Sequence, residues 1–275
     1  MRPREKTLNI ECPNLFKLDG KWILLTSPHR PCEYYVGALD LEACRFLPDT
    51  HGILDPGDAY ASNISTDDRG RAILWLWGRT HTPPGRGWNG VIVMPRILSI
   101  APDGGLRQDV PAEFASLRGA IKTFADLSLT DVPRVLDGVR GDAVEVQAEF
   151  VVKGSAAFGF ELHPSPSDAP TTVVTIQEGT LTVGSARAYI GNTDRYTIRL
   201  FLDKGCLEVY VNDGAAAVYV ALDAAPSTRA VAVFGRTARF DSSSRPSDRT
   251  PPVRLVSLRA WPMSPASFNL DRFHA

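Results

Sequence analysis

The chain has 275 residues, and its 30 Lys and Arg side chains nearly balance 31 Asp and Glu side chains, for a formal net charge of −1. Hydrophobic residues make up 44 % and charged residues 22 % of the sequence, a composition that excludes long disordered regions. Without a basic excess the chain is not expected to bind nucleic acid. No apolar run approaches the roughly 18–20 residues that a membrane-spanning helix needs, so no membrane partner is expected.

The start of the chain and its cysteines exclude two further classes of protein. Residues 1–11 carry several charges and are followed by no apolar h-region, so we expect no secretory signal peptide and favour a cytoplasmic location. Cys12, Cys32, Cys44 and Cys206 form no C-x-x-C pair, and no His stands at zinc spacing from them. These thiols are therefore expected to be free and to bind no metal.

Short runs rich in β-branched and aromatic residues, bounded by turn residues such as Asp19-Gly20, occupy the first part of the chain. Four of them are predicted to be strands, at 22–26, 34–37, 72–77 and 91–94. No segment before residue 110 keeps a 3.6-residue period with helix caps. This part is therefore predicted to be antiparallel β.

The pattern changes after residue 110. Residues 111–118 are predicted to form a short helical turn or a linker, and turn residues such as Asp131 and Gly138 indicate a boundary. Further strands are predicted at 144–151, 156–162, 172–176, 196–202, 207–211, 218–222, 230–234 and 253–261. Many short strands with turns between them favour a two-sheet sandwich. Asn212-Asp213-Gly214 is predicted to be a hairpin turn, and 241–252 an exposed loop.

Glu11, which precedes Cys-Pro, is the first candidate catalytic residue. A carboxyl kept protonated by apolar surroundings can donate a proton to a leaving oxygen, and Leu8, Ile10 and Leu15 would provide such surroundings. Taken alone, however, Glu11 is better interpreted as an exposed side chain at a strand edge, because most Glu residues are exposed.

Several motifs stand in a fixed order around and beyond Glu11. They are E-C-P at 11–13, G-D-A-Y-A at 57–61, G-R-A-I-L-W-L-W at 70–77, G-W-N-G at 87–90, P-R-I-L at 95–98, L-R-Q at 106–108, E-F…L-R at 113–118 and L-E-V-Y-V-N-D-G at 207–214. In this order they resemble glycoside hydrolase family 32, the family of invertases, sucrose-6-phosphate hydrolases and fructan hydrolases. The resemblance covers nearly the whole chain. It implies an all-β fold with part of a five-bladed β-propeller (1–118), a linker (119–141) and a C-terminal β-sandwich (142–275).

The resemblance also implies an activity and a set of site residues. Members hydrolyse β-fructofuranosides such as sucrose and fructans by retaining double displacement, without metal or cofactor. Glu11 would be the general acid/base, and the matching motifs place Asp58, Tyr60, Trp77 and Trp88 at the substrate.

The residues themselves leave some of these roles open. Trp75 and Trp77 are two positions apart and share one face of a strand; we expect Trp75 in the core, and leave Trp77 open between core and pocket. Aromatic faces pack against sugar rings, and Trp88, between glycines, is predicted to line the pocket. Arg96 is expected to be structural rather than catalytic.

Two family motifs have no match. The N-D-P-N-G motif, whose Asp is the nucleophile, is absent. The R-D-P motif is also absent, and the segment most similar to it is S-P-H-R-P at 27–31. A retaining glycosidase needs two carboxyls about 5–5.5 Å apart. We therefore expect a chain without the first blades, inactive or incomplete alone. Such a chain would need a complementing N-terminal half as its partner, or it would associate with other copies of itself. The alternatives are a non-catalytic sugar-binding or vestigial protein, and a gene that begins further upstream.

Overall fold

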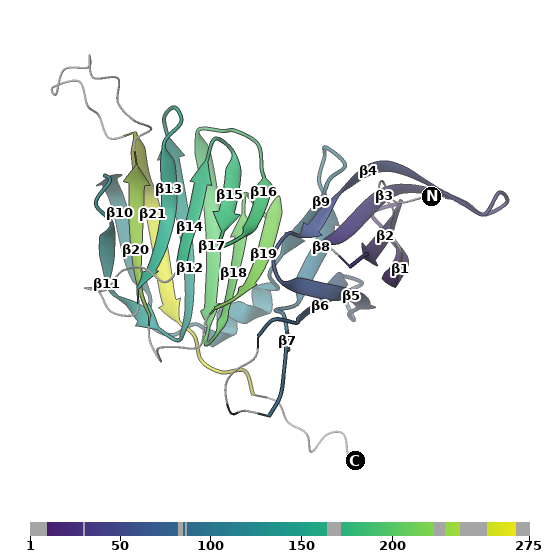
Figure 1. Ribbon diagram of the computed structural model, residues 1–275, viewed down its shortest axis with the longest axis horizontal. Helices are drawn as coiled ribbons and strands as arrows, with labels where there is room; N and C mark the ends of the chain where they lie inside the picture. Colours follow the sequence, from purple (N-terminus) through teal and green to yellow (C-terminus); the bar gives the residue numbers. More distant parts are fainter. Residues whose placement is uncertain are drawn as a thin grey trace.

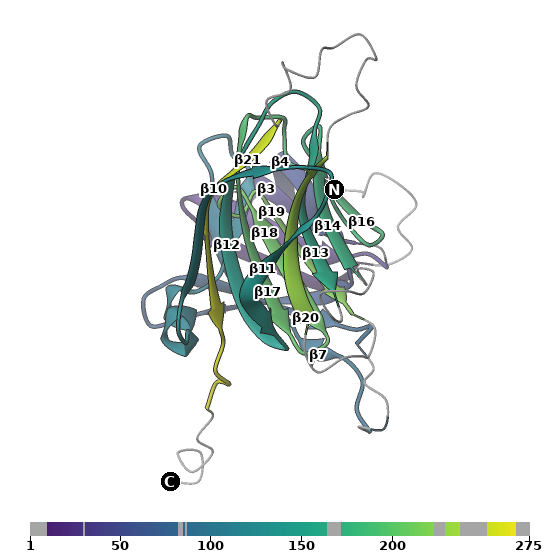
Figure 2. The same cartoon turned by 90° about the vertical axis from the view of Figure 1, so that its left-hand side faces the viewer.

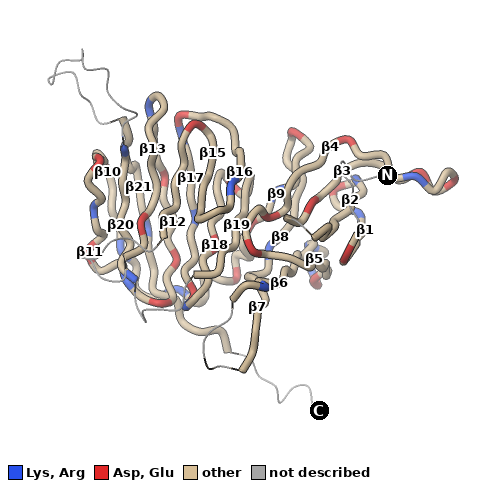
Figure 3. The backbone as a smooth tube through the Cα atoms, viewed as in Figure 1, with Lys and Arg blue, Asp and Glu red and all other residues tan. Residues whose placement is uncertain are grey.

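The structure is a computed structural model that describes residues 10–29, 31–81, 85, 87–163, 172–222, 229–236 and 252–267. The described residues form two bodies of antiparallel strands that follow one another along the chain (Figures 1 and 2). Charged residues of both signs are spread along the backbone of both bodies (Figure 3). No helix in the described ranges is long and apolar enough to cross a membrane.

The first body consists of two sheets, which lie at the right of Figure 1. The four-stranded sheet runs β1 (Glu11–Leu18), β2 (Lys21–Ser27), β3 (Cys32–Asp40) and β4 (Arg45–Asp55). The second sheet runs β5 (Ala59–Thr66), β6 (Ala72–Gly78), β8 (Arg96–Ile100) and β9 (Leu106–Asp109), and β7 (Val91–Ile92) pairs with β6. These strands confirm the antiparallel β prediction for this part of the chain.

The alternation of side chains in β6 determines how this body packs. Leu74 and Leu76 are buried in the core that the two sheets share, and Trp75 and Trp77 lie on the other face. The expectation that Trp75 lies in the core is therefore wrong. Its indole Nε1 instead donates a hydrogen bond to Ser65 Oγ at 2.8 Å.

The second body is a sandwich of two six-stranded sheets. One sheet has the order β10-β21-β12-β17-β18-β19 and the other β11-β20-β13-β14-β15-β16. Their bounds are β10 Lys122–Leu129, β11 Arg134–Gly141, β12 Ala143–Val152, β13 Ala157–His163, β14 Thr172–Gln177, β15 Thr180–Val183, β16 Ala186–Tyr189, β17 Arg195–Asp203, β18 Cys206–Val211, β19 Ala216–Ala221, β20 Arg229–Arg236 and β21 Val253–Pro262. The predicted order, propeller strands followed by a sandwich, is confirmed.

Residues 119–141, predicted to be a linker, instead contribute β10 and β11, one strand to each sandwich sheet. Gly138 has φ of +70°, and the register of β11 shifts between Val135 and Arg140. The turn residues therefore form an irregularity inside a strand, and Leu136 and Val139 within it are buried. Turn-forming residues in a sequence do not by themselves distinguish such a bulge from a loop.

Two short connections match the expectations. Residues 112–117 form a 3₁₀-helix, η1 (Ala112–Leu117), between β9 and β10. The Asn212-Asp213-Gly214 turn joins β18 to β19, and all three residues have positive φ. A Cβ atom on Gly214 would lie 2.2 Å from the carbonyl oxygen of Gln108, so only Gly allows this turn to contact β9. The loop predicted at 241–252 lies, apart from Pro252, outside the described residues.

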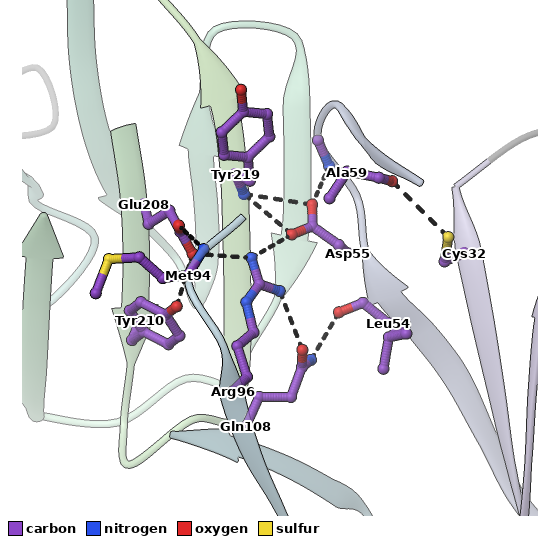
Figure 4. A network of polar contacts seen from close by, with 11 residues as sticks. Cys32, Leu54, Asp55, Ala59, Met94, Arg96, Gln108, Glu208, Tyr210 and Tyr219 are labelled. Carbon is purple, nitrogen blue, oxygen red and sulfur yellow. Dashed lines mark hydrogen bonds and ion pairs between the residues drawn. The ribbon is translucent and has the colours of Figure 1, made fainter. Parts of the chain in front are cut away.

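A buried polar network joins the two bodies (Figure 4). The side chain of Arg96 in β8 is fully buried, and its Nη2 lies 2.8 Å from Asp55 Oδ2 and 3.3 Å from Glu208 Oε2. Its Nη1 donates a hydrogen bond to the Gln108 side chain at 3.0 Å. Asp55 ends β4 in the first body, and Glu208 belongs to β18 of the sandwich. This burial agrees with a structural role for Arg96.

Backbone groups complete the network. Asp55 accepts hydrogen bonds from the N–H groups of Gly57 at 2.8 Å and Tyr219 at 3.0 Å. Glu208 accepts one from the N–H of Met94 at 2.8 Å and one from the Tyr210 hydroxyl at 2.7 Å. Removal of two carboxyls from water is costly unless such donors replace it. The network therefore fixes how the sandwich sits against β4 and β8.

The network predicts an unusual pH dependence of stability. Desolvation, which outweighs the attraction of Arg96, raises the pKa of Asp55 from 3.8 to about 6. Between these two pH values the folded protein keeps a proton that the unfolded chain has lost, so the free energy of unfolding falls as pH rises through this window. Over this window the loss of the Asp55 proton is expected to lower the free energy of unfolding by on the order of 3 kcal/mol.

The measurement is denaturant unfolding of the wild type and Asp55→Asn between pH 4 and 7. The wild type should lose stability relative to the variant as pH rises. Burial also raises the pKa of Glu208, which faces the same guanidinium, so Glu208→Gln should show a related but separate difference. A constant difference between wild type and Asp55→Asn over this range would contradict the prediction.

Candidate active site

Glu11 is the first residue of β1, and an irregularity in that strand determines its position. The register of β1 with β2 shifts between Glu11 and Asn14, and Cys12 between them has φ of +45°. The side-chain amide of Asn14 donates hydrogen bonds to the carbonyls of Cys12 at 2.9 Å and Ser62 at 2.8 Å, which holds β1 against β5. Such bulges redirect a side chain, and the side chain of Glu11 is left 37 % exposed.

The Tyr60 hydroxyl is the centre of the contacts around Glu11. Its oxygen lies 2.9 Å from Glu11 Oε2 and 2.7 Å from the carbonyl oxygen of Ser27, and it accepts a hydrogen bond from the N–H of His29 at 2.9 Å. His29 Nε2 lies 3.1 Å from Glu11 Oε1. The structure therefore brings Glu11 and Tyr60, both predicted site residues, into direct contact.

The two acceptors of the Tyr60 hydroxyl matter because the hydroxyl has a single proton. When Glu11 is ionised, Tyr60 donates this proton to the carboxylate. When Glu11 is protonated, Tyr60 donates to Ser27 and accepts the proton of Glu11. Desolvation, with a smaller contribution from the Glu11 carboxylate, raises the pKa of Tyr60, so the phenol keeps its proton. The arrangement thus accommodates both protonation states that a general acid/base must adopt.

The other three predicted residues fall into two groups. Asp58 contacts the sandwich: its Oδ2 accepts a hydrogen bond from the N–H of Ala221 at 3.3 Å, and its own N–H donates to Tyr219 at 2.8 Å. These contacts are not with Glu11 or Tyr60. Trp77 and Trp88 are exposed, at 41 % and 48 %.

The exposed tryptophans lie on the strand next to Tyr60 and on the loop that follows it. Trp77 is the register partner of Tyr60 across β5 and β6. A Cβ atom on Gly90 would lie 2.1 Å from Trp77 Nε1, so the G-W-N-G loop depends on glycine to pass close to this indole. The Trp88 ring packs at 5.8 Å from the ring of His81. The sequence left open whether Trp77 lies in the core or in the pocket, and its exposure excludes the core.

Sequence reasoning missed two residues at this site. His29 contacts Glu11 as described, and the guanidinium carbon of Arg79 lies 4.6 Å from the centre of the Tyr60 ring. A signal for His29 was available, because a hairpin about Asp19-Gly20 places Glu11 opposite the end of β2, and the register indeed pairs Glu11 with Ser27. No such local signal exists for Arg79, since β5 and β6 must first pack beside β1.

The polar groups gathered here are hydroxyl, imidazole, guanidinium and carboxyl groups beside exposed aromatic rings. This mixture suits a sugar, whose hydroxyls need polar partners and whose C–H faces pack on aromatic rings. Among the residues that the structure describes, no group of three or more His, Cys, Asp or Glu side chains could hold a metal ion.

Comparison with known proteins places the chain in a family. The model for "Glycosyl hydrolases family 32 N-terminal domain" matches residues 2–109, and that for "Glycosyl hydrolases family 32 C terminal" matches residues 113–220. A levanase of Bacillus sp. (strain L7) is 29 % identical over 74 % of this chain and 27 % of its own length. A sucrose-6-phosphate hydrolase of Bacillus subtilis (strain 168) is 24 % identical over 74 % of this chain and 47 % of its own. The chain thus spans less than half the length of these relatives.

A solved structure supports the same fold. Fructan 1-exohydrolase IIa from Cichorium intybus, in complex with 1-kestose, aligns with a TM-score of 0.77 at 17 % identity, over 94 % of this chain and 62 % of that one. The two family models follow each other along the chain as the two bodies of strands do, and together they cover most of it. The chain belongs to glycoside hydrolase family 32.

Proposed function

We propose that this chain contributes the general acid/base part of a β-fructofuranosidase site that acts on sucrose or fructans. The observation that carries the proposal is the contact of Glu11, in the E-C-P motif, with the Tyr60 hydroxyl at 2.9 Å. That hydroxyl can partner Glu11 in either protonation state, which is what an acid/base residue needs. The names of the relatives, a levanase and a sucrose-6-phosphate hydrolase, support the substrate class.

In the proposed mechanism Glu11 acts twice. Its protonated carboxyl gives its proton to the glycosidic oxygen as the bond to the fructosyl carbon breaks, and the leaving sugar departs as an alcohol. The resulting carboxylate then takes a proton from the water that releases the fructosyl group. Tyr60 turns its O–H from Ser27 to Glu11 after the first transfer and back after the second. Trp77 and Trp88 offer aromatic faces for the sugar rings.

Retention requires a second carboxylate as nucleophile. We propose that it comes from an upstream segment or a complementing chain that carries the N-D-P-N-G motif. Asp58 is a poor candidate for this role, because its carboxylate is bonded to the backbone of Ala221.

A second candidate function, non-catalytic sugar binding, is favoured by the His29–Glu11 pair. His29 Nε2 lies 3.1 Å from Glu11 Oε1, so an N–H on this nitrogen would donate a hydrogen bond to the carboxyl. A carboxyl held by this contact and by Tyr60 can also accept hydrogen bonds from sugar hydroxyls, which binding without catalysis requires.

One experiment distinguishes the two functions. The chain is assayed with sucrose and with 1-kestose, alone and co-expressed with a propeller segment that carries N-D-P-N-G, and sugar binding is measured by calorimetry in parallel. Hydrolysis by the co-expressed pair, above that of the segment alone, supports the acid/base proposal. Binding without hydrolysis in either preparation supports the sugar-binding function. Neither binding nor hydrolysis would contradict both.

A further inference from the structure

His81 links the sandwich to the loop that carries Trp88. The turn between β17 and β18 lies against His81, where a Cβ atom on Gly205 would be 2.1 Å from His81 Cε1. The ring of His81 also packs on the ring of Trp88, with 5.8 Å between the ring centres. Because Gly205 has no side chain, the backbone of the sandwich reaches the imidazole directly, and the imidazole in turn contacts an exposed tryptophan.

Hydrogen bonds hold the sandwich side of this contact in place. The carbonyl of Gly205 accepts one from the N–H of Leu222, directly after β19, at 2.8 Å. The carbonyl of Lys204 accepts one from the guanidinium of Arg229 in β20 at 2.9 Å, and the Arg229 side chain is buried. Since β19 and β20 belong to different sheets, the turn is tied to both sheets of the sandwich and presents a fixed surface to His81.

The base of the Trp88 loop is fixed as well. The N–H of Gly90 donates a hydrogen bond to the carbonyl of His81 at 2.7 Å, which keeps the two ends of the loop together. The strand before the loop also lies against the sandwich, because β19 runs beside β5 and β6 (Figure 1). There a Cβ atom on Gly78 would be 2.5 Å from the ring of Tyr219. The start of the loop therefore contacts the sandwich at two points, Gly78 and His81.

An exposed aromatic side chain on a loop loses conformational freedom when a sugar packs on it, and this loss weakens binding. A ring that His81 already holds has less freedom to lose. We propose that the sandwich positions Trp88 for the sugar through His81, which makes His81 and Gly205 positioning residues of the site that contains Glu11. This inference rests on the proposed function and gives the sandwich a part in it.

The first test measures the surroundings of the Trp88 ring without a sugar. The chain, which has five Trp, is labelled with fluorotryptophan for fluorine NMR, and Trp88→Phe identifies the resonance of Trp88. We expect Gly205→Ala, whose methyl group displaces the imidazole, to shift this resonance. His51→Ala is the matched control and should leave it unchanged, because His51 packs on the ring of Tyr35, at 6.0 Å, and not on Trp88. An unshifted Trp88 resonance in folded Gly205→Ala overturns the inference.

The second test measures what this position contributes to sugar binding in the chain completed by its nucleophile-bearing segment. His81→Ala should raise the KM for 1-kestose about 3- to 10-fold, which is the effect of ordering one further side chain on binding. The kcat should stay nearly unchanged, because Glu11 still transfers the proton. His81→Phe keeps a ring against Trp88 and should restore most of the wild-type KM.

A double variant shows whether His81 acts through Trp88. Trp88→Ala should itself raise KM, and adding His81→Ala to it should raise KM no further, because the ring that His81 positions is already gone. His51→Ala should leave both KM and kcat at the wild-type values.

The outcomes separate this inference from the proposed function. If the completed chain hydrolyses 1-kestose and His81→Ala leaves KM unchanged, the positioning role is wrong and the proposed function stands. Effects that add in the double variant would mean that His81 acts independently of Trp88, which also overturns the inference. If the completed wild-type chain neither binds nor hydrolyses 1-kestose, the proposed function fails and this inference fails with it.

Discussion

Glu11→Gln is expected to lower the rate of sucrose hydrolysis by about 10²–10⁴-fold in the chain completed by its nucleophile-bearing segment. Gln matches Glu in size and can still contact Tyr60, but its amide can neither donate nor accept the catalytic proton. Because the chemistry and not the fold is removed, the thermal stability of the variant should equal that of the wild type. Initial rates of glucose release measure the effect.

A comparison of substrates with different leaving groups shows whether the carboxyl removed in Glu11→Gln acts as an acid. A p-nitrophenyl fructoside has a leaving group that needs little protonation, so Glu11→Gln should slow its cleavage far less than that of sucrose. Glu42→Gln, in the exposed turn between β3 and β4, is the matched control and should change neither rate. Equal losses on the two substrates would mean that Glu11 acts in binding rather than as a proton donor.

Arg96→Leu is expected to lower the free energy of unfolding by about 3–5 kcal/mol. The change removes the cation that lies 2.8 Å from Asp55 and 3.3 Å from Glu208. Both carboxyls are buried, so each would have to keep a proton or remain charged without a partner. Denaturant unfolding at pH 7 measures the loss. If Arg96→Leu does not fold, Arg96→Lys replaces it in the measurement. Lys keeps the positive charge but cannot contact both carboxyls, so this variant should show part of the loss in unfolding free energy.

Two further variants identify the cause of that loss. Arg107→Leu removes an arginine whose partner Asp103 is exposed, and such a surface pair is worth about 0–1 kcal/mol. Adding Asp55→Asn and Glu208→Gln to Arg96→Leu removes the unpaired charges, so most of the stability should return. If the triple variant is no more stable than Arg96→Leu, lost packing and not unpaired charge explains the effect.

Parts of this architecture are predictable because they depend on local pattern. Strands such as β12 and β17 alternate apolar and polar residues with period two, and such alternation is stable only with one face buried. The hairpin turn Asn212-Asp213-Gly214 follows from residues that tolerate positive φ. Errors arose where local signals are ambiguous: Gly138 indicated a loop but forms a bulge, and Trp75 is apolar but faces away from the core.

The sequence by itself determined the family, through motifs in a fixed order, and the succession of strands, and it predicted Glu11 as the acid/base. Only the tertiary structure decided what surrounds that carboxyl. Tyr60 contacts Glu11 from 49 positions away along the chain, Asp58 contacts the sandwich, and Arg79 lies over Tyr60. Each of these contacts depends on strand register and on how the sheets pack, and no local sequence pattern specifies which side chains meet across separate sheets.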